Sequence, residues 1–110
     1  MANSWTLAAS GTTTPTVGAL TTLTTNTTNG TFCFEIDPTA VMVLGDLLET
    51  TILTKTLTGG TEAPIWFDSC QDVQFCKKVS PFVASDIEIQ IKINQVAGTA
   101  RAFPWKLLII

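Results

Sequence analysis

The chain has 110 residues, with nine acidic and six basic side chains, a net charge of −3 and no histidine. This length predicts one domain spanning residues 1–110 with its own core, because domains most often contain about 100–150 residues. The missing histidine removes the usual general base, the usual metal ligand and every Ser-His or Cys-His nucleophile, so we expect no enzyme, no metal and no cofactor. The acidic balance argues against a nucleic-acid partner, and the longest apolar run, Ala40 to Leu44, is too short for a membrane span.

Threonine is the most unusual feature of the composition, with 20 positions, 11 of them between Thr12 and Thr31. Many threonines with few charges suit a pleated sheet surface better than an exposed helix. A disordered Thr/Ser linker is the alternative for this stretch, but the recurring Val17, Leu20 and Leu23 favour ordered strands. The Thr-rich residues 1–30 are also a candidate interaction arm. The start of the chain has no basic region ahead of a long apolar stretch, so we expect no cleaved signal peptide.

The first predicted strands are a short one near Ser4 to Ala9 and another from Val17 to Thr25. Asn29-Gly30 follows and is the strongest short hairpin signal in the chain. The next strand, Thr31 to Asp37, alternates between apolar and polar residues, and we expect its inward side chains to be Phe32, Phe34 and Ile36.

One segment breaks the β pattern. Asp37 is a capping residue followed by Pro38 at a first helical position, which predicts one or two helical turns over Pro38 to Leu44, closed by Gly45. A longer helix to Lys55 is the alternative, and Gly45 and the threonines between 50 and 58 disfavour it.

Three plausible strands come next, and the turn residues that bound them are Gly59-Gly60, Asp68-Ser69 and Ser80-Pro81. The strands are Leu47 to Leu57, Ala63 to Asp68 and Val73 to Val79. We interpret Gly59-Gly60 as a hairpin turn, since it lacks the lysine and the helix of a phosphate-binding loop.

The clearest alternation is Ile87 to Asn94, where four isoleucines face one way and four polar side chains the other, as in a half-buried antiparallel strand. Phe103 to Ile109 also alternates. Pro104 cannot donate a hydrogen bond to a neighbouring strand, so this strand lies at an edge or position 104 points away from its neighbour. About eight short strands predict an all-β fold, an antiparallel β-sandwich or jelly roll.

The three cysteines match no zinc or redox spacing. Cys33 lies within an alternating strand and is predicted to be a small buried hydrophobe. Cys70 and Cys76 are able to form a disulfide if Asp68 to Val73 is a tight turn. Three unpaired thiols fit assembly in a reducing cytoplasm.

Two further groups of residues suggest chemistry or binding. Glu35 and Asp37 lie two apart on one strand face, close enough to suggest a glycosidase pair. Alternation alone explains this placement, and a catalytic pair usually comes from different elements so that it can flank a bond. Trp5, Trp66 and Trp105 are able to form an aromatic platform for sugars, although core or protein-interface positions are the more common role of such rings.

The last four residues, Leu107 to Ile110, are all apolar, and an alternating core strand explains only two of them. The other two are exposed unless a second subunit covers them. Trp5 and Leu7, near the start of the chain, would likewise be exposed without a covering subunit. The sequence therefore suggests a protein that assembles with others. Its candidate interface residues are Trp5, Leu7, Trp66, Phe67, Leu108 and Ile110.

A resemblance follows from three stretches. Gly30-Thr31 leads into an apolar strand that ends at Asp37, Leu44-Gly45-Asp46-Leu47 comes next, and Gln95 to Trp105 completes the series. Over most of the chain from Leu20 onward, the sequence resembles short virion structural proteins of tailed bacteriophages and prophages. The resemblance implies a small β-sandwich, similar to the jelly-roll cement or decoration proteins that sit on capsids, and it implies no catalytic residue.

The expected function is accordingly that of a capsid decoration protein, made in the host cytoplasm and bound to the major capsid protein on the outside of the virion. Dimerisation across lattice two-fold axes is the expected oligomeric state, since such interfaces are the commonest. A tail or head-tail adaptor component is one alternative. A carbohydrate-binding module is another, with Trp66 and Phe67 as its test residues.

Overall fold

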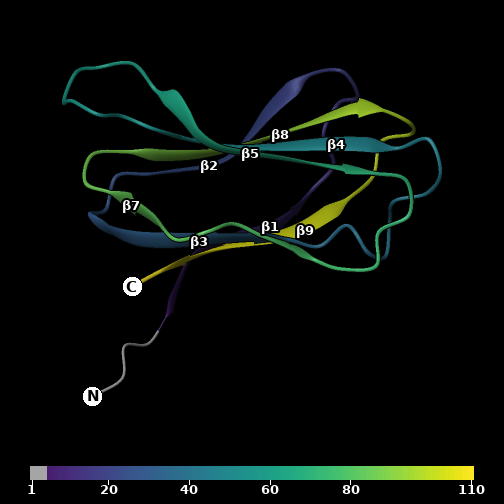
Figure 1. Ribbon diagram of the computed structural model, residues 1–110, viewed down its shortest axis with the longest axis horizontal. Helices are drawn as coiled ribbons and strands as arrows, with labels where there is room; N and C mark the ends of the chain where they lie inside the picture. The colour runs from purple at the N-terminus through teal and green to yellow at the C-terminus, as the bar shows by residue number, and fades with distance from the viewer. Residues whose placement is uncertain (1–4) are drawn as a thin grey trace.

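Nine strands and no helix form between residues 5 and 110, the range that the computed structural model describes. They lie in two layers, drawn edge-on in Figure 1. No helix in this range is long and apolar enough to cross a membrane. The strands are β1 (Thr6–Thr13), β2 (Leu20–Asn26), β3 (Gly30–Ile36), β4 (Leu47–Thr54), β5 (Ala63–Gln71), β6 (Lys78–Val79), β7 (Val83–Ser85), β8 (Ile89–Ala97) and β9 (Phe103–Ile109).

The strand pairing is nested and antiparallel throughout. β1 pairs with β9, β2 with β8, β3 with both β6 and β7, and β4 with β5, as if one long hairpin had been rolled up. Pairing of β3 with β9 and of β4 with β8 then produces two sheets, β1-β9-β3-β6/β7 and β2-β8-β4-β5. This is the strand order of a jelly roll, with β6 and β7 sharing one place. The predicted fold class is confirmed.

The break between β6 and β7 lies at the predicted Ser80-Pro81 boundary. Proline has no N–H to continue the ladder, and the Ser80 side chain takes over part of the pairing instead. The Phe34 N–H donates to Ser80 Oγ at 2.9 Å, while the Ser80 N–H donates to the Phe34 carbonyl at 2.8 Å.

The core lies between the sheets and is formed mainly by the two strands with the clearest alternation. Ile89, Ile91 and Ile93 of β8 are fully buried. On the facing sheet, Phe32 and Phe34 of β3 are fully buried too. Burial of each such side chain is worth about 1.5–3 kcal/mol. These predicted inward faces are confirmed.

Of the one or two helical turns predicted over Pro38 to Leu44, a single turn forms at the start of the segment, and no helix follows it. The segment forms one hydrogen-bonded turn, in which the Val41 and Met42 N–H groups both donate to the Pro38 carbonyl, and then a second turn through Gly45. The chain must reverse here to pass from one sheet to the other. Burial of Met42 in the core holds the first turn in place, and the positive φ of Gly45 permits the second.

Three other turn and strand predictions need correction. Asn29-Gly30 does not join a hairpin, because β2 and β3 belong to different sheets. Asp68-Ser69 is not a turn, because β5 continues to Gln71 with Asp68 opposite Thr50. Of the predicted strand Val73 to Val79, only the last two residues pair. Local turn chemistry does not decide which distant strand becomes the neighbour.

The β9 strand is not at an edge, since it lies between β1 and β3. The other expectation, that position 104 points away from its neighbour, holds for β1 but not for the chain that continues β3. The Asp37 N–H donates to the Pro104 carbonyl at 2.9 Å. Because the N–H and C=O positions of a strand residue point to the same side, the missing donor faces Asp37, just beyond the last residue of β3. No β1 partner is lost.

The cysteines are all free thiols. Cys33 is buried, as predicted, and Cys70 is also buried, whereas Cys76 is exposed. The bridge between Cys70 and Cys76 does not form, because the turn that it required is replaced by a continuing strand.

The core strand β8 provides a direct stability test. Ile91→Ala should lower the free energy of unfolding by about 2–5 kcal/mol, because it opens a cavity at a fully buried position. Val96→Ala on the same strand, where the side chain is 41% exposed, should cost less than about 1 kcal/mol. Urea unfolding followed by tryptophan fluorescence measures both. Equal losses would show that β8 is not the centre of the core.

Candidate interaction surface

The outer face of the sheet that contains β1, β9 and β3 has an apolar row across three strands. Leu7 pairs with Leu108, which pairs in turn with Cys33. Paired residues lie on the same side of a sheet. Since Leu107, the chain neighbour of Leu108, is fully buried in the core, this row points outward. We call this surface the β1–β9 face, comprising Leu7, Cys33, Leu108 and the neighbouring Trp5, Phe82 and Ile110.

An aromatic pair extends the apolar part of the β1–β9 face. The rings of Trp5 and Phe82 lie 5.2 Å apart, centre to centre, and are tilted by 50°. Phe82 is 72% exposed, whereas Cys33 on the same face is 7% exposed. The Cys33 thiol donates to the Ser80 carbonyl at 3.4 Å. The face therefore combines covered and exposed apolar groups.

A charged hollow of about 360 Å³ adjoins the apolar row. Glu35, which lies opposite Lys106 in the ladder, is the central charge. Its Oε2 atom lies 3.6 Å from Lys106 Nζ and 3.8 Å from Lys77 Nζ. Leu7 and Asp37 also line the hollow. An apolar patch bordered by charges is the usual anatomy of a protein interface.

Asp37 and Glu35, the carboxylate pair noted in the sequence, thus line one hollow, but both are engaged. Asp37 Oδ1 accepts hydrogen bonds from the N–H and the hydroxyl of Thr39. These bonds hold the pKa of Asp37 below its ordinary value of 3.8. A carboxylate that stays ionised in this way suits ion pairing better than proton donation.

The predicted interface residues fall into two groups. Trp5, Leu7, Leu108 and Ile110 come together on or beside the β1–β9 face. The other two lie on β5 in the opposite sheet, where Phe67 is 56% exposed on the outer surface and Trp66 packs against the core.

The three tryptophans do not form one platform. Trp105 packs against the core, 6.4 Å from the Phe34 ring, and donates its Nε1–H to Thr13 Oγ1 at 3.0 Å. Trp66 packs against the same core from the other sheet. Only Trp5 lies on the β1–β9 face. The aromatic residues thus serve mainly as packing anchors.

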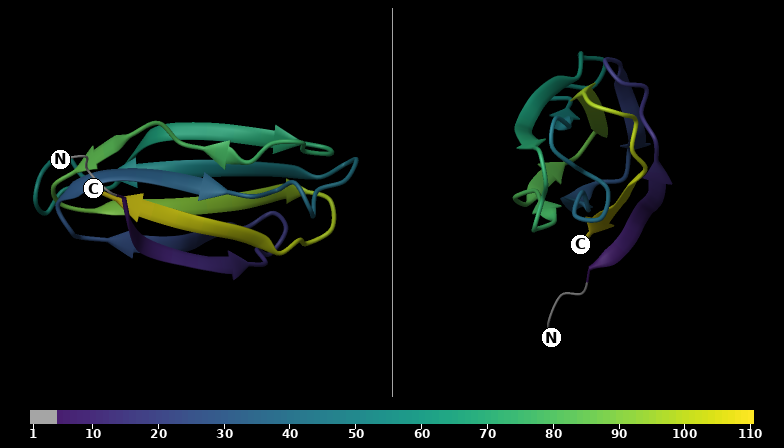
Figure 2. Two further views of the ribbon diagram at one scale, coloured as in Figure 1. Left: turned by 90° about the horizontal axis from the view of Figure 1, so that it is seen from below. Right: turned by 90° about the vertical axis from the view of Figure 1, so that its right-hand side faces the viewer.

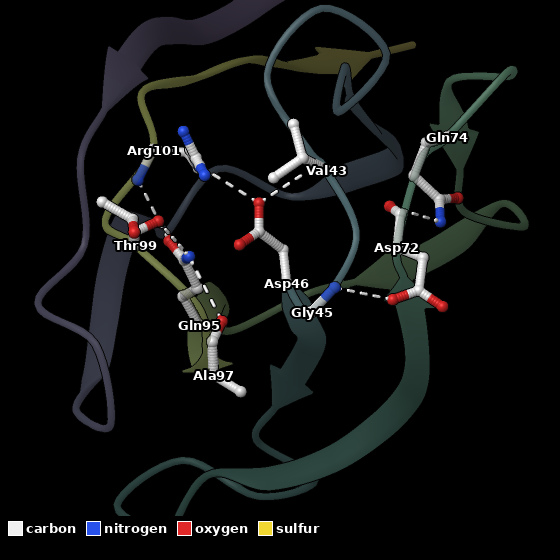
Figure 3. Close-up of polar contacts among 9 residues, drawn as sticks. All are labelled: Val43, Gly45, Asp46, Asp72, Gln74, Gln95, Ala97, Thr99 and Arg101. Atoms are coloured by element: carbon white, nitrogen blue, oxygen red, sulfur yellow. Dashed lines mark hydrogen bonds and ion pairs between the residues drawn. The ribbon is translucent and has the colours of Figure 1, made fainter.

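A second feature, which sequence reasoning missed, is a brace that joins the loops at one end of the sandwich (Figure 3). Asp46 is 1% exposed, and its Oδ2 accepts from Arg101 Nε at 3.1 Å and from the Val43 N–H at 3.0 Å. Burial raises the pKa of Asp46, but these bonds outweigh that effect and hold it below 3.8. The carboxylate therefore stays ionised and fixes two loops.

Gln95 completes the brace from the end of β8. Its side-chain amide donates to the Thr99 carbonyl at 2.6 Å and to the Ala97 carbonyl at 3.3 Å, and its oxygen accepts from the Arg101 N–H. The Gly98 φ of 98° lets the loop pass beside Asp46. No side-chain atom of Asp46 or Gln95 is among the buried polar atoms that lack a partner, and a satisfied buried network of this kind is rigid.

The braced loops display apolar side chains at their tips. Leu44 is 82% exposed and Phe75 is 89% exposed. The Asp72 carboxylate accepts from the Gly45 N–H at 2.9 Å and so links the two loops that carry them. The sequence held one signal that Phe75 lies in a loop. The residues around Phe75 do not alternate between apolar and polar, whereas a strand with one buried face should alternate.

At the opposite end, Glu62 in the β4–β5 loop has buried carboxyl oxygens with no hydrogen-bond partner among the described residues. Burial, reinforced by the nearby Glu88 carboxylate, raises the pKa of Glu62 to about 7. Glu88 itself lies 3.4 Å from Lys55. Glu62 does not line the charged hollow, so its raised pKa is a separate feature of the molecule.

No group of three metal-ligating side chains occurs in residues 5–110. No protein-family model, no curated protein and no solved structure matches this chain significantly. The class of protein is therefore defined by the fold and the surface alone. The described residues form a small jelly-roll domain whose β1–β9 face is apolar and is bordered by charged side chains.

The brace can be tested at the glycine beside it. A Cβ at Gly98 would overlap Asp46 Oδ1, and φ at this position is positive. Gly98→Ala should therefore lower the free energy of unfolding by about 3 kcal/mol or more, from backbone strain and loss of the ion pair. Gly18→Ala is the control, because its φ is also positive but the space around it is open, and it should cost about 1 kcal/mol. Similar losses in thermal unfolding would argue against the brace.

Glu62 predicts a pH dependence of stability. Glu62 titrates near 4.5 in the unfolded chain and near 7 in the folded one. Between these values the unfolded chain releases a proton that the folded chain keeps, so stability falls as pH rises. Glu62→Gln should remove this decline and be more stable than the wild type at pH 8. Urea unfolding from pH 4.5 to 8 tests this, with Glu49→Gln as the control for net charge. A wild-type pH profile for Glu62→Gln would contradict it.

Proposed function

We propose that this protein is a structural subunit that stabilises a larger assembly by binding other protein subunits through the β1–β9 face. The observation that supports this function is the apolar row with its neighbouring aromatic pair, bordered by the charged hollow. Exposed apolar surface that is contiguous and bordered by polar groups is typical of protein interaction sites.

The assembly that we propose is a tailed-bacteriophage capsid, with the protein as a decoration protein on the outside of the major capsid lattice. Two arguments by analogy support this narrower proposal. The jelly roll is frequent in viral capsid proteins, although a fold does not by itself define a function. The sequence resemblance, carried by Gly30 to Asp37, Leu44 to Leu47 and Gln95 to Trp105, points to virion proteins.

Physical chemistry suits this role. A protein that binds only the assembled lattice stabilises that state by mass action. Many weak contacts repeated over a lattice give high avidity. A rigid core of fully buried isoleucine and phenylalanine side chains keeps the binding face in one conformation, which lowers the entropic cost of binding.

Sugar binding is less well supported by the geometry. Trp66 and Trp105 are partly buried against the core from different sheets, and Phe67 is left as a single exposed ring on its sheet, so the rings do not form one platform. A tail or adaptor subunit would use the same protein-binding surface, and copy number in the particle distinguishes it from a decoration protein.

The first experiment is quantitative mass spectrometry of purified virions, where a decoration protein should be present in hundreds of copies. About six or twelve copies at one vertex would indicate an adaptor with ring symmetry. Absence from the particles would overturn the virion proposal.

The binding face is tested with two variants of equal exposure. Leu7 and Phe67 are both 56% exposed, but they lie on outer faces of different sheets. Leu7→Lys should weaken binding to capsid shells at least tenfold, about 1.4 kcal/mol, because it places a charge in the apolar row. Phe67→Lys should bind as the wild type does. Equal affinities for the two variants in a shell co-sedimentation assay would show that another surface is used.

A further inference from the structure

The lateral edges of the two sheets differ strongly. On one side, the edge strands are short or carry protective features: β6 and β7 have two and three residues, and β5 contains Pro64 and Asp68. Asp68 Oδ2 also lies 3.7 Å from Lys78 Nζ, which links the two sheets there. Charges, prolines and short strands are the usual protection of a sheet edge against pairing with another chain.

The other side has neither charge nor proline in its edge strands. β1 and β2 are the end strands of their sheets and lie side by side, as the end-on view in Figure 2 shows. Residues 5–34, which include both strands, contain no charged side chain. In the described part of the chain, β1 has one strand neighbour, β9, so its other edge offers unpaired backbone groups.

The two open edges are not equivalent, because β-bulges interrupt them at different points. The β2 register shifts between Thr22 and Thr24, which leaves two runs of three paired residues. The β1 register shifts between Leu7 and Ala9, which leaves five consecutive paired residues from Ala9 to Thr13. The β1 edge therefore offers the longest regular, uncharged strand for pairing.

We infer that two copies of this chain pair antiparallel through the Ala9–Thr13 edge of β1, about a two-fold axis at Gly11. This symmetry places Ser10 opposite Thr12 of the second copy and Ala9 opposite its Thr13. Hydroxyl pairs of this kind are favourable across antiparallel strands. A residue near a two-fold axis lies close to the same residue of the second copy. A charged residue there would repel its own copy, and the Ala9–Thr13 edge has no such residue.

The pairing would join the two copies into one continuous sheet. A two-fold axis normal to that sheet keeps both β1–β9 faces on the same side. The dimer would then present two binding faces to a lattice at once, which raises avidity without a new contact. This inference deepens the proposed function, but it depends on the strand edges and not on the apolar face, so the two can fail separately.

The test compares two exposed threonines on the two open edges, Thr12 on β1 and Thr25 on β2. Light scattering coupled to size-exclusion chromatography should show a dimer for the wild-type chain. Thr12→Lys should shift the population to monomer, because it puts two positive charges close to the axis. Thr25→Lys, with the same substitution on the other edge, should remain a dimer, and so should Leu7→Lys.

The register has its own measurement. In a Cys76→Ser background, where both remaining cysteines are buried, Ser10→Cys with Thr12→Cys should give a disulfide-linked dimer under mild oxidation. Thr22→Cys with Thr25→Cys should not. A monomeric wild-type chain at every soluble concentration, or a dimer that survives Thr12→Lys, would overturn the inference. Loss of shell binding in Leu7→Lys alone would still support the proposed function.

Discussion

Ile89, Ile91 and Ile93 of β8 are fully buried and need a second apolar sheet face to cover them. Phe32 and Phe34 of β3 supply that face from the other sheet, more than 50 residues earlier in the chain. Each of these two strands lies inside its sheet, β8 between β2 and β4 and β3 between β9 and β6/β7. The nested roll brings them together. The strands that remain at the edges, β1 above all, are then free to determine how the domain meets other molecules.

The sequence was most informative where one face of a strand is buried. The alternation in β3 and β8 predicted their inward residues, because a strand with two-residue periodicity has one arrangement that buries every apolar side chain. The hairpin predicted at Asn29-Gly30 was wrong because a turn signal is local. Whether the next strand pairs with the previous one or joins the other sheet depends on residues far away in the sequence. The same limit applies to Val73 to Val79, where the loop around Phe75 is fixed by the Asp72 contact with Gly45.

The candidate surface was predictable only in part. Leu108 and Ile110 stood out because an alternating strand cannot bury adjacent apolar residues on one side. Phe82 did not, since its role depends on contact with Trp5 across the sheet. The brace of Asp46, Gln95 and Arg101 could not be predicted from the sequence either. Its members are separated by up to 55 positions, and each resembles an ordinary polar loop residue.

The two sides of the molecule differ both in the charge of their edge strands and in how those edges are protected. All fifteen charged residues occur at Glu35 or later, so β1 and β2 have none. On the opposite side, the Asp68–Lys78 ion pair closes the gap between the sheets. A monomer that had to avoid edge pairing would place such charges on its longest regular edge, and Ala9–Thr13 lacks them. Leu7, on the same strand, begins the apolar row, so a second copy at this edge would bring two such rows onto one surface.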